Sequence, residues 1–486
     1  MKKITFFYLF SFVTALNGWA QNELDGLRYA RTFNVGTARF NAMGGSFGAL
    51  GADASVISTN PAGLALFKRS EVSISPSIFI NNNETDYLGT TEKDGKANFN
   101  FNNLSYTHAA DKNRVSGWLS STWQVSYSRV NNHNSQTSYA GQNNTTSILD
   151  SYLYELDNNL IPIEDIPDYA SLNTWAAWET FAIDTVMISP SEYQYIVNLE
   201  SFDAFQRKEI ETSGSQGEVT FAYSGNYNNR FFIGGSISLV TLNYSYSSTY
   251  TETYPAEDTL NSIVIREEYE NSGNGFNAKL GMVYRINDYL RVGAAIHSPT
   301  FYSVDDVFSN SMTSNFRGVG ALSFSTPVYE TNYSIRTPWR FMLSGGAIVG
   351  KKGLLNVDYE LVDYSTIKLN ASDYDLDGLN SSIQSVFKTA HNVRVGGEYR
   401  INNIAIRGGY RFEMSPYSSS YSNMGSNRNT VSFGGGFRHR NFFIDAAWMT
   451  SFYDESVYLY DPSFSEAASK RTLDHRLTIS AGIRWL

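Results

Sequence analysis

Apolar and polar residues alternate along much of this chain with a period of two, and the last segment shows this most clearly. From Arg471 to Leu486 the odd positions form one mostly apolar set: Leu473, His475, Leu477, Ile479, Ala481, Ile483 and Trp485. The even positions between them are polar or small. Successive side chains of a β-strand point to opposite faces, so this segment is predicted to be a strand with two different faces. A soluble strand typically has about 5–6 residues, whereas about 10 suffice to cross a bilayer at a tilt.

The same alternation recurs in five further segments: 115–127, 219–227, 276–286, 339–349 and 393–401. Six connections between the expected strands are very short and rich in Asn, Asp, Gly and Lys, as tight hairpins require: 110–113, 228–230, 287–289, 351–353, 402–403 and 438–441. Seven connections are long: 81–97, 131–215, 251–273, 303–336, 367–390, 413–429 and 454–470. Short and long connections alternate strictly, which is typical of a transmembrane barrel with turns on one side and loops on the other.

We therefore predict an all-β fold, a transmembrane antiparallel β-barrel of about 14 strands, at residues 71–486 with a long outer loop at 131–215. An alternative adds a hairpin within 303–336, because 321–335 has some strand character. We assign this segment to an outer loop.

Composition excludes several other classes of protein. The chain has 37 basic and 47 acidic residues, and its net charge of −10 argues against nucleic-acid binding, which needs a basic surface. There is no Cys, so disulfides and Cys-based metal sites are impossible. None of the six His has metal-ligand spacing with a second His, and no G-x-S-x-G motif is present. We expect no enzymatic activity.

The first residues have the pattern of a signal peptide. Met1 to Lys3 is a basic start, 4–16 is almost wholly apolar, and small residues at Gly18 and Ala20 predict cleavage before Gln21. The alternative is a membrane anchor, but this apolar run is shorter than the roughly 20 residues that a spanning helix needs. Residues 1–20 are therefore predicted to direct the protein out of the cytoplasm, and the mature barrel to the outer membrane of a Gram-negative cell.

Residues 21–70 precede the first expected strand and are small, Gly-rich and mildly apolar, most clearly at 42–53. Such a segment would be a poor free extension in water. A barrel of this size would otherwise have a water-filled lumen. We predict that the segment forms a plug, or hatch, inside the barrel.

The motifs of this segment resemble a known family. Asp53-Ala54, followed by Asn60, Pro61, Ala62, Gly63 and Leu64, is similar to the hatch of FadL-type outer-membrane transporters of long-chain fatty acids and aromatic hydrocarbons. Later stretches that resemble the strands of this family are 337–340, 358–365 and 407–417. In layout, the resemblance covers the whole mature chain.

The resemblance implies a monomeric barrel in the outer-membrane lipid that takes up a hydrophobic small molecule passively and without a cofactor. Outer loops would capture the ligand, a lumenal pocket would hold it, and an opening made by a kink in the third strand would release it sideways. Asn60, Pro61 and Ala62 would hold the hatch turn near that opening, or form a structural turn without ligand contact. Residues 114–130 contain no Pro and only Gly117, so the sequence shows no sign of the kink. An alternative function is an interaction protein, such as a type nine secretion accessory that docks secreted partners on its outer loops.

Two loop motifs are further candidates. Trp175, Trp178 and Phe181 are three residues apart, which places them on one face of a helix. They could form an external landing site for ligand or a small loop core on the barrel rim. Asp373, Asp375 and Asp377 precede Gly378 in a D-x-D-x-D-G pattern that resembles the first half of a calcium loop. Gln384 replaces the Glu expected at the twelfth position, so this is either a calcium site or an acidic solvated loop.

Overall fold

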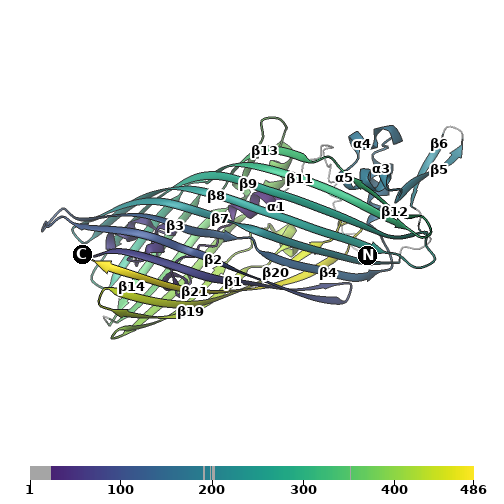
Figure 1. The fold of residues 1–486 in the computed structure, drawn as a ribbon. Coiled ribbons are helices and arrows are strands. Elements are labelled where there is room, and N and C mark those ends of the chain that lie inside the picture. Colours follow the sequence, from purple (N-terminus) through teal and green to yellow (C-terminus); the bar gives the residue numbers. More distant parts are fainter. Residues whose placement is uncertain (1–22, 190–191, 198, 200–202, 351, 486) are drawn as a thin grey trace, which may run out of the picture.

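The computed structural model describes residues 23–189, 192–197, 199, 203–350 and 352–485. The predicted signal peptide, residues 1–20, lies outside the described residues, and its cleavage stays a prediction. The described chain forms one antiparallel barrel that is closed by pairing of the first and last strands (Figure 1). Its strand segments are β1 (Ser70–Tyr87), β2 (Thr90–Asp111), β3 (Trp118–Asn132), β4 (Ser135–Asn143), β7 (Ala204–Tyr227), β8 (Phe231–Thr253), β9 (Leu260–Arg285), β10 (Leu290–His297), β11 (Phe301–Phe316), β12 (Gly320–Ser325), β13 (Tyr329–Arg336), β14 (Arg340–Val349), β15 (Gly353–Asp363), β16 (Lys368–Asn370), β17 (Thr389–Ile401), β18 (Ile404–Glu413), β19 (Arg428–His439), β20 (Phe442–Tyr458) and β21 (Ala467–Trp485).

These nineteen segments make fourteen barrel strands, because several strands are interrupted. β3 continues into β4, β10 into β11, β12 through β13 into β14, and β15 into β16, as their shared neighbours show. The predicted fold class, a fourteen-stranded barrel with an N-terminal plug, is confirmed.

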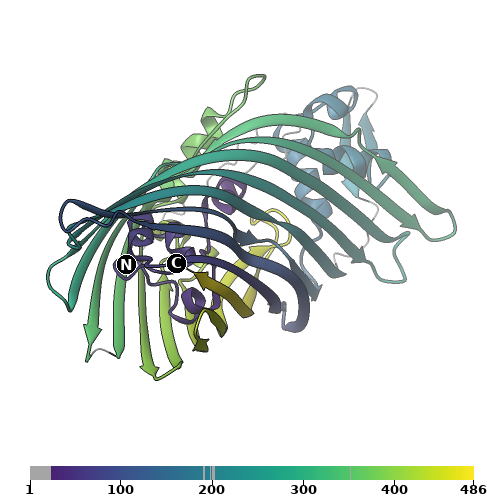
Figure 2. The ribbon, with the colours of Figure 1, turned by 60° about the vertical axis from the view of Figure 1, so that its left-hand side comes forward.

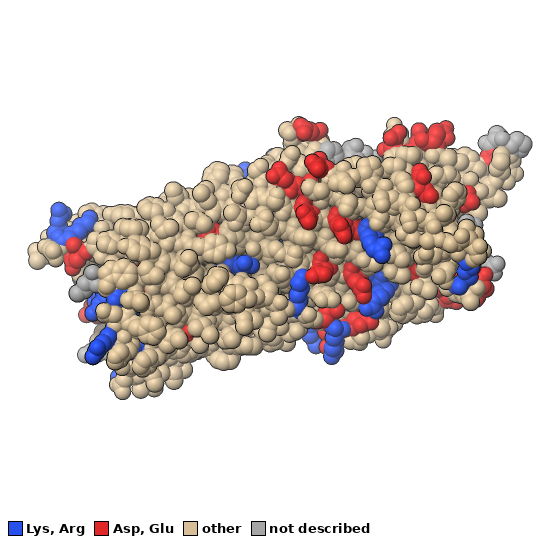
Figure 3. All heavy atoms as spheres, in the orientation of Figure 1, with Lys and Arg blue, Asp and Glu red and all other residues tan. Residues whose placement is uncertain are grey.

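An apolar belt surrounds the barrel near its short turns. On four consecutive strands, exposed apolar residues at the outer edge of the belt are cross-strand partners in one row: Val219, Leu239, Phe276 and Phe301. From this row toward the short turns the outward positions remain apolar, as at Leu280, which is 63% exposed. Figure 3 shows this zone almost free of charge, with Lys and Arg at the turn end and many acidic residues beyond its other edge. A belt of this kind is what the hydrocarbon of a bilayer covers.

Beyond the belt the strands continue, and the two faces exchange character. In β8 the outward residues become polar after Leu239, as at Thr241 and Ser247, while the inward residues become aromatic, as at Tyr244 and Tyr250. This outer extension is therefore an ordinary water-exposed barrel with an apolar interior, stacked on a membrane barrel with a polar lumen.

The extension corrects several loop predictions. Residues 81–97 are strand joined by a tight turn at Leu88 and Gly89, which both have positive φ, and 251–273 is strand except for a six-residue connection. The assignment of 303–336 to a loop was wrong, because β11, β12 and β13 occupy it; 321–335 is strand, as the alternative proposed. Strands also cover both ends of the predicted loop 131–215.

The hatch, residues 23–69, fills the lumen of the membrane barrel and appears in purple inside the wall in Figure 2. It has little regular structure: α1 (Glu23–Ala30), α2 (Ala38–Ala42), η1 (Ala54–Ser58) and η2 (Pro61–Leu66). The outer loops carry most of the remaining elements: α3 (Ile148–Asn158), η3 (Ile163–Asp165), α4 (Ile166–Tyr169), α5 (Leu172–Glu179), the hairpin of β5 (Ile183–Ser189) and β6 (Glu192–Val197), η4 (Tyr364–Thr366), α6 (Asp377–Val386) and η5 (Ser419–Met424). Within the described ranges, none of the helices has the length and apolar character needed to span a membrane.

The position of the belt can be tested with two arginine substitutions. Leu280→Arg should lower the free energy of unfolding by about 2–4 kcal/mol, the range for Arg at the lipid face near the bilayer midplane. Ser247→Arg, on the outward face of the extension, should change it by less than about 0.5 kcal/mol. Urea unfolding of the barrel in lipid vesicles measures both, and equal effects would contradict this placement of the membrane.

Candidate ligand-binding site

A cavity of about 630 Å³ lies in the lumen beside the hatch. Its walls come from α1 and the hatch residues that follow it, from β1, from the junction of β3 and β4, and from β20 and β21 with their connecting loop. The cavity thus lies between the hatch and the outer extension, where the polar lumen meets the aromatic interior.

The cavity is basic, although the chain is acidic overall. Six cationic and two anionic side chains line it: Arg28, Arg31, Arg129, Arg428, Lys470 and Arg476, with Glu455 and Asp474. Arg428 pairs with Asp474 at 2.8 Å, and Lys470 with Glu455 at 3.0 Å. Arg28 pairs with Asp25 on its own helix.

The other three arginines, Arg31, Arg129 and Arg476, form no ion pair with any described residue. Arg129 also has a buried Nε without a hydrogen-bond partner among the described atoms. An uncompensated cation is costly away from water, so this surplus of positive charge requires an explanation.

Aromatic rings lie beside these cations. The guanidinium of Arg31 is 5.1 Å from the ring centre of Phe33, and that of Arg476 is 4.9 Å from Phe79. Arg28 lies 4.4 Å from the ring of Tyr244. Stacked guanidinium groups cover apolar ring surface while their N–H groups remain able to donate hydrogen bonds. The cavity is therefore amphipathic, with apolar walls and exposed donors.

The third strand leaves the wall beside this cavity. Main-chain pairing of β2 with β3 ends at Asn103 and Ser128, and in the described chain β4 pairs only with β7. The outer edge of β4 instead receives side chains of β1: the Asn83 amide donates to the Gln136 carbonyl at 2.6 Å, and the Thr85 hydroxyl to the Ser138 carbonyl at 2.6 Å. β4 therefore lies over the lumenal face of the β1–β2 hairpin.

This inward turn is the kink of which residues 114–130 show no sign, and it lies just beyond them, at His133 and Asn134. At the turn, the His133 amide donates to the carbonyl of Gly214 of β7 at 3.1 Å. Gly214 has a φ of 108°, and a Cβ there would lie 2.2 Å from the Asn243 carbonyl oxygen. On the β2 side of the gap, Phe99 and Phe101 are exposed, at 64% and 43%. The main-chain hydrogen bonds of the wall are therefore interrupted between β2 and β4, at a point where its outer surface is apolar.

The motif Asn60-Pro61-Ala62-Gly63 lies deep in the hatch, against the wall. The Asn60 side chain caps η2 by accepting from the Ala62 amide at 3.1 Å, and its Nδ2 donates to the carbonyls of Gly48 and Met282 at 2.8 and 3.0 Å. Pro61 is the first residue of η2. The motif therefore joins two hatch segments to β9, and none of its residues lines the 630 Å³ cavity.

Three wall glycines make room for this motif. A Cβ at Gly281 would lie 2.0 Å from the Asn60 Oδ1, one at Gly234 would lie 2.7 Å from the Pro61 carbonyl, and one at Gly293 would lie 2.5 Å from the Gly48 carbonyl. The close approach of the hatch, by its backbone at Gly234 and Gly293 and by the Asn60 side chain at Gly281, needs wall residues without a side chain.

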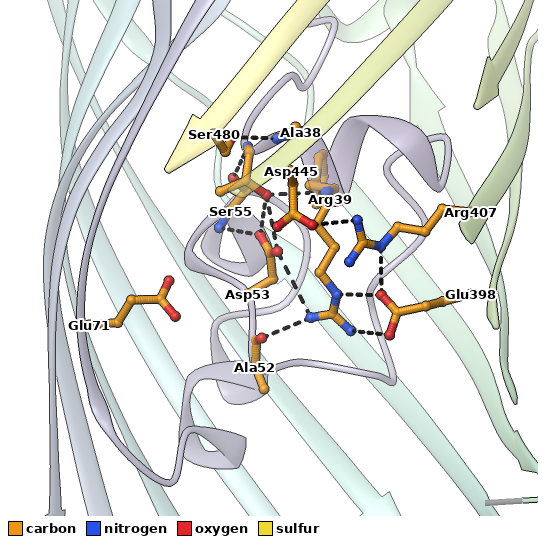
Figure 4. A network of polar contacts seen from close by, with 12 residues as sticks. Ala38, Arg39, Ala52, Asp53, Ser55, Glu71, Glu398, Arg407, Asp445 and Ser480 are labelled. Carbon is orange, nitrogen blue, oxygen red and sulfur yellow. Dashed lines mark hydrogen bonds and ion pairs between the residues drawn. The ribbon is translucent and has the colours of Figure 1, made fainter. Parts of the chain in front are cut away.

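A buried ionic network, which the sequence analysis missed, fixes the other side of the hatch (Figure 4). Arg39 of α2 donates to Glu398 of β17 at 2.8 Å and to the Ala52 carbonyl at 2.9 Å. Arg407 of β18 donates to Glu398 at 2.7 Å and to Asp445 of β20 at 2.6 Å. The only signal in the sequence was that charged residues occupy lumen-facing positions of several predicted strands. That signal does not identify which of these residues pair with one another.

The three aromatic candidates of the outer loop are not equivalent. Trp175 and Trp178 lie on α5 and pack against a loop core that includes Leu149, with the Trp175 ring 5.0 Å from that of Phe324. Phe181 lies beyond the end of α5, has a φ of 55° and is 55% exposed. None of the three lines the cavity.

The three acidic candidates lie at the exposed start of α6. Asp375 accepts a hydrogen bond from the Asp377 amide at 2.8 Å, and Asp373 accepts from Ser372. Across the described part of the chain, no group of three or more His, Asp or Glu side chains is placed to hold a metal ion. The choice between a calcium site and an acidic solvated loop therefore stays a prediction.

A fourteen-stranded transmembrane barrel with a lumenal hatch and an amphipathic cavity defines a class of outer-membrane channels for hydrophobic compounds. The family model described as "Outer membrane protein transport protein (OMPP1/FadL/TodX)" matches residues 218–483, and the chain belongs to this family of non-enzymatic outer-membrane proteins. A second model, described as "Uncharacterised protein family (UPF0164)", matches residues 18–139. No curated protein matches the chain.

Solved structures agree with the fold. A Pseudomonas aeruginosa FadL homologue is 13% identical with a TM-score of 0.55, and the alignment covers 93% of this chain and 98% of that one. The toluene transporter TodX of P. putida is 12% identical with a TM-score of 0.51, over 92% and 98% of the two chains. At these identities the likeness concerns the fold alone.

The fit of hatch to wall can be tested by adding one methyl group. Gly281→Ala should displace Asn60 and weaken hatch docking by about 1–3 kcal/mol, as overpacking does in a tight core. Gly345→Ala is the matched control, because a Cβ there meets nothing within 4 Å. Limited proteolysis of the hatch and ion conductance in planar bilayers should both increase for Gly281→Ala only. An unchanged hatch in that variant would show that this contact does not hold it.

Proposed function

We propose that this barrel takes up long-chain fatty acids, or amphiphiles with the same anionic head and apolar tail, across the outer membrane by passive diffusion. The observation that carries the proposal is the amphipathic cavity, in which three arginines form no ion pair with any described residue and two of them, Arg31 and Arg476, lie beside aromatic rings. The names of the structural neighbours, which include a toluene transporter, support hydrophobic compounds as the general class.

The charge of the cavity favours a fatty acid over an aromatic hydrocarbon. Burial of the acyl chain would contribute on the order of 25 cal/mol per Å² of apolar surface. A hydrocarbon would gain only this, and would leave Arg31 and Arg129 desolvated and unpaired. A carboxylate would form charge-assisted hydrogen bonds with them, which are about twice as strong as neutral ones. No metal, nucleotide or redox group is part of this proposal, and we propose that the barrel acts as a monomer.

We propose that the ligand leaves sideways, through the wall at the β3–β4 junction. Residues 131–135 of this junction line the cavity, and the exposed Phe99 and Phe101 lie on the membrane side of the same gap. In this structure side chains bridge the gap: Lys96 of β2 donates to Glu211 and to the Thr212 carbonyl, each at 2.8 Å. These exposed polar contacts are the ones that release of ligand would break.

Uptake itself can be tested with two ligands that differ only in the head group. We expect the protein in vesicles to bind and pass oleate about tenfold better than oleyl alcohol, since a hydrogen bond to a charged group is worth about 1.5–3 kcal/mol. Arg129→Gln should remove this preference without changing thermal stability. Arg266→Gln, an exposed arginine on the outward face of β9, is the charge-matched control.

Equal binding of both ligands by the unmodified protein would contradict the proposed fatty-acid specificity, and binding of neither would contradict uptake. Native mass spectrometry of the purified barrel, with extraction of bound lipid, gives an independent measurement.

A second candidate function, docking of a secreted protein, is favoured by one feature: Val186, Met187 and Ile188 of the β5–β6 hairpin are 45–71% exposed. An empty barrel that retains such a protein at equal stoichiometry would support it.

The two roles considered for the outer-loop aromatics predict different phenotypes. We propose that Phe181 contributes to ligand capture, whereas Trp175 and Trp178 hold the loop core. Phe181→Ser should slow oleate capture from dilute solution several-fold and leave stability unchanged, because the ring is exposed. Trp175→Ala should destabilise the loop by about 3 kcal/mol, the lower end of the range for removal of a large aromatic side chain, because the ring is only partly buried. Stopped-flow binding and protease sensitivity of residues 144–203 separate the two effects.

A further inference from the structure

A second cavity, of about 690 Å³, lies on the outside of the barrel. It is a groove between the outward faces of β13 and β16, the short η4 and the exposed face of α6, and it shares no lining residue with the lumenal cavity. α6 turns Ile383 and Val386 inward to the core, so that Asp377, Ser381 and Gln384 face the groove.

Two cations stand side by side in this groove. Arg336 of β13 and Lys368 of β16 are direct cross-strand partners, and both are exposed on the same face of the sheet. Directly opposed residues on neighbouring strands have Cβ atoms roughly 4.5–5.5 Å apart, and like charges there are destabilising. Neither side chain forms an ion pair with any residue that the structure describes. A bound anion would convert this repulsion into a favourable interaction.

The level of the pair along the barrel indicates what kind of anion it meets. Arg336 is the cross-strand partner of Phe301, which belongs to the row of exposed apolar residues at the outer edge of the belt. Trp339, three residues further along the chain, is 49% exposed at the same edge of the belt. Aromatic residues of this kind mark the interface of a membrane with water. The two cations therefore lie at the height of lipid headgroups in the outer leaflet.

The chemistry of the lining favours a phosphate group. Arg presents a planar pair of donors that matches phosphate oxygens, and Lys adds a compact point charge. The exposed Gln384 amide supplies a further N–H donor. Asp377 is the single acidic residue of the lining, against Arg336 and Lys368, so the lining has a net positive charge.

We propose that this groove binds the phosphate of a phosphorylated lipid in the outer leaflet, with the phosphate on Arg336 and Lys368 and the acyl chains against Phe301 and Trp339. A free phosphate ion could satisfy the two cations, but it would make no use of the apolar belt directly below them. This site is independent of the proposed uptake, because it lies on the opposite side of the wall from the lumenal cavity.

Native mass spectrometry of the full-length barrel, released from detergent with lipid A as the added probe, tests the proposal. We expect one retained diphosphorylated lipid A, and at least a tenfold weaker retention by the double variant Arg336→Gln, Lys368→Gln. The matched control, Lys112→Gln with Arg114→Gln, removes two exposed charges from the β2–β3 turn at the other end of the barrel and should retain the lipid. Asp377→Asn should strengthen retention, because it removes the one repulsive charge.

Two further probes separate the sources of the phosphate. Dephosphorylated lipid A should be retained no better by the unmodified protein than by the double variant, and inorganic phosphate should compete only at high concentration. Equal retention of lipid A by the unmodified protein and the Arg336→Gln, Lys368→Gln variant would overturn the proposal. Tight binding of inorganic phosphate that lipid A does not displace would overturn it as well, in favour of a site for the free ion.

Discussion

The architecture depends on the hydrogen bonds and ion pairs between the hatch and the lumenal face of the wall. The hatch has few regular hydrogen bonds of its own, and buried main-chain groups must find partners. The wall provides them: Asp358 accepts from the amides of Phe47 and Gly48, and Arg411 donates to the Gly44 carbonyl. In return, Arg39 of the hatch forms an ion pair with Glu398, which also pairs with Arg407 of the wall. Each part therefore supplies hydrogen-bond or ion-pair partners for the buried polar groups of the other.

At the edge of the belt the apolar residues change from the outward to the inward face of the strands. The same strands therefore form two parts with different surroundings and different interiors. Within the belt, lipid surrounds the barrel and the lumen has polar side chains to hold the hatch. Above it, water surrounds the barrel and the interior is aromatic, with Tyr244 and Tyr269 packed against the first helix of the hatch through Arg28. The cavity lies at the boundary, and this position explains why it offers both guanidinium groups and rings.

Much of this fold could be predicted from the sequence, because lipid contact imposes a strict alternation on each crossing strand. Strands such as β21, and the need for a plug, follow from that alternation and from the small residues of the hatch. The extension was not predicted, because near Leu242 the apolar residues of β8 change from the outward to the inward positions. In a sequence, such a break in the alternation looks like the end of a strand. The turn at His133 contains no Pro, and Gly214, whose carbonyl accepts from the His133 amide, lies on another strand. Phe181 keeps the helical spacing of Trp175 and Trp178, but the helix ends at Glu179. Such features depend on contacts between distant residues.

The length of the extension has a consequence for where a ligand is first met. From Thr241 to Thr253, β8 rises about 3.3 Å per residue, or about 40 Å along the strand beyond the belt. Even with the tilt of barrel strands, the mouth stands tens of ångströms above the lipid. A sparingly soluble molecule that enters there would travel this distance inside the barrel, out of contact with bulk water, before it reaches the level of the membrane.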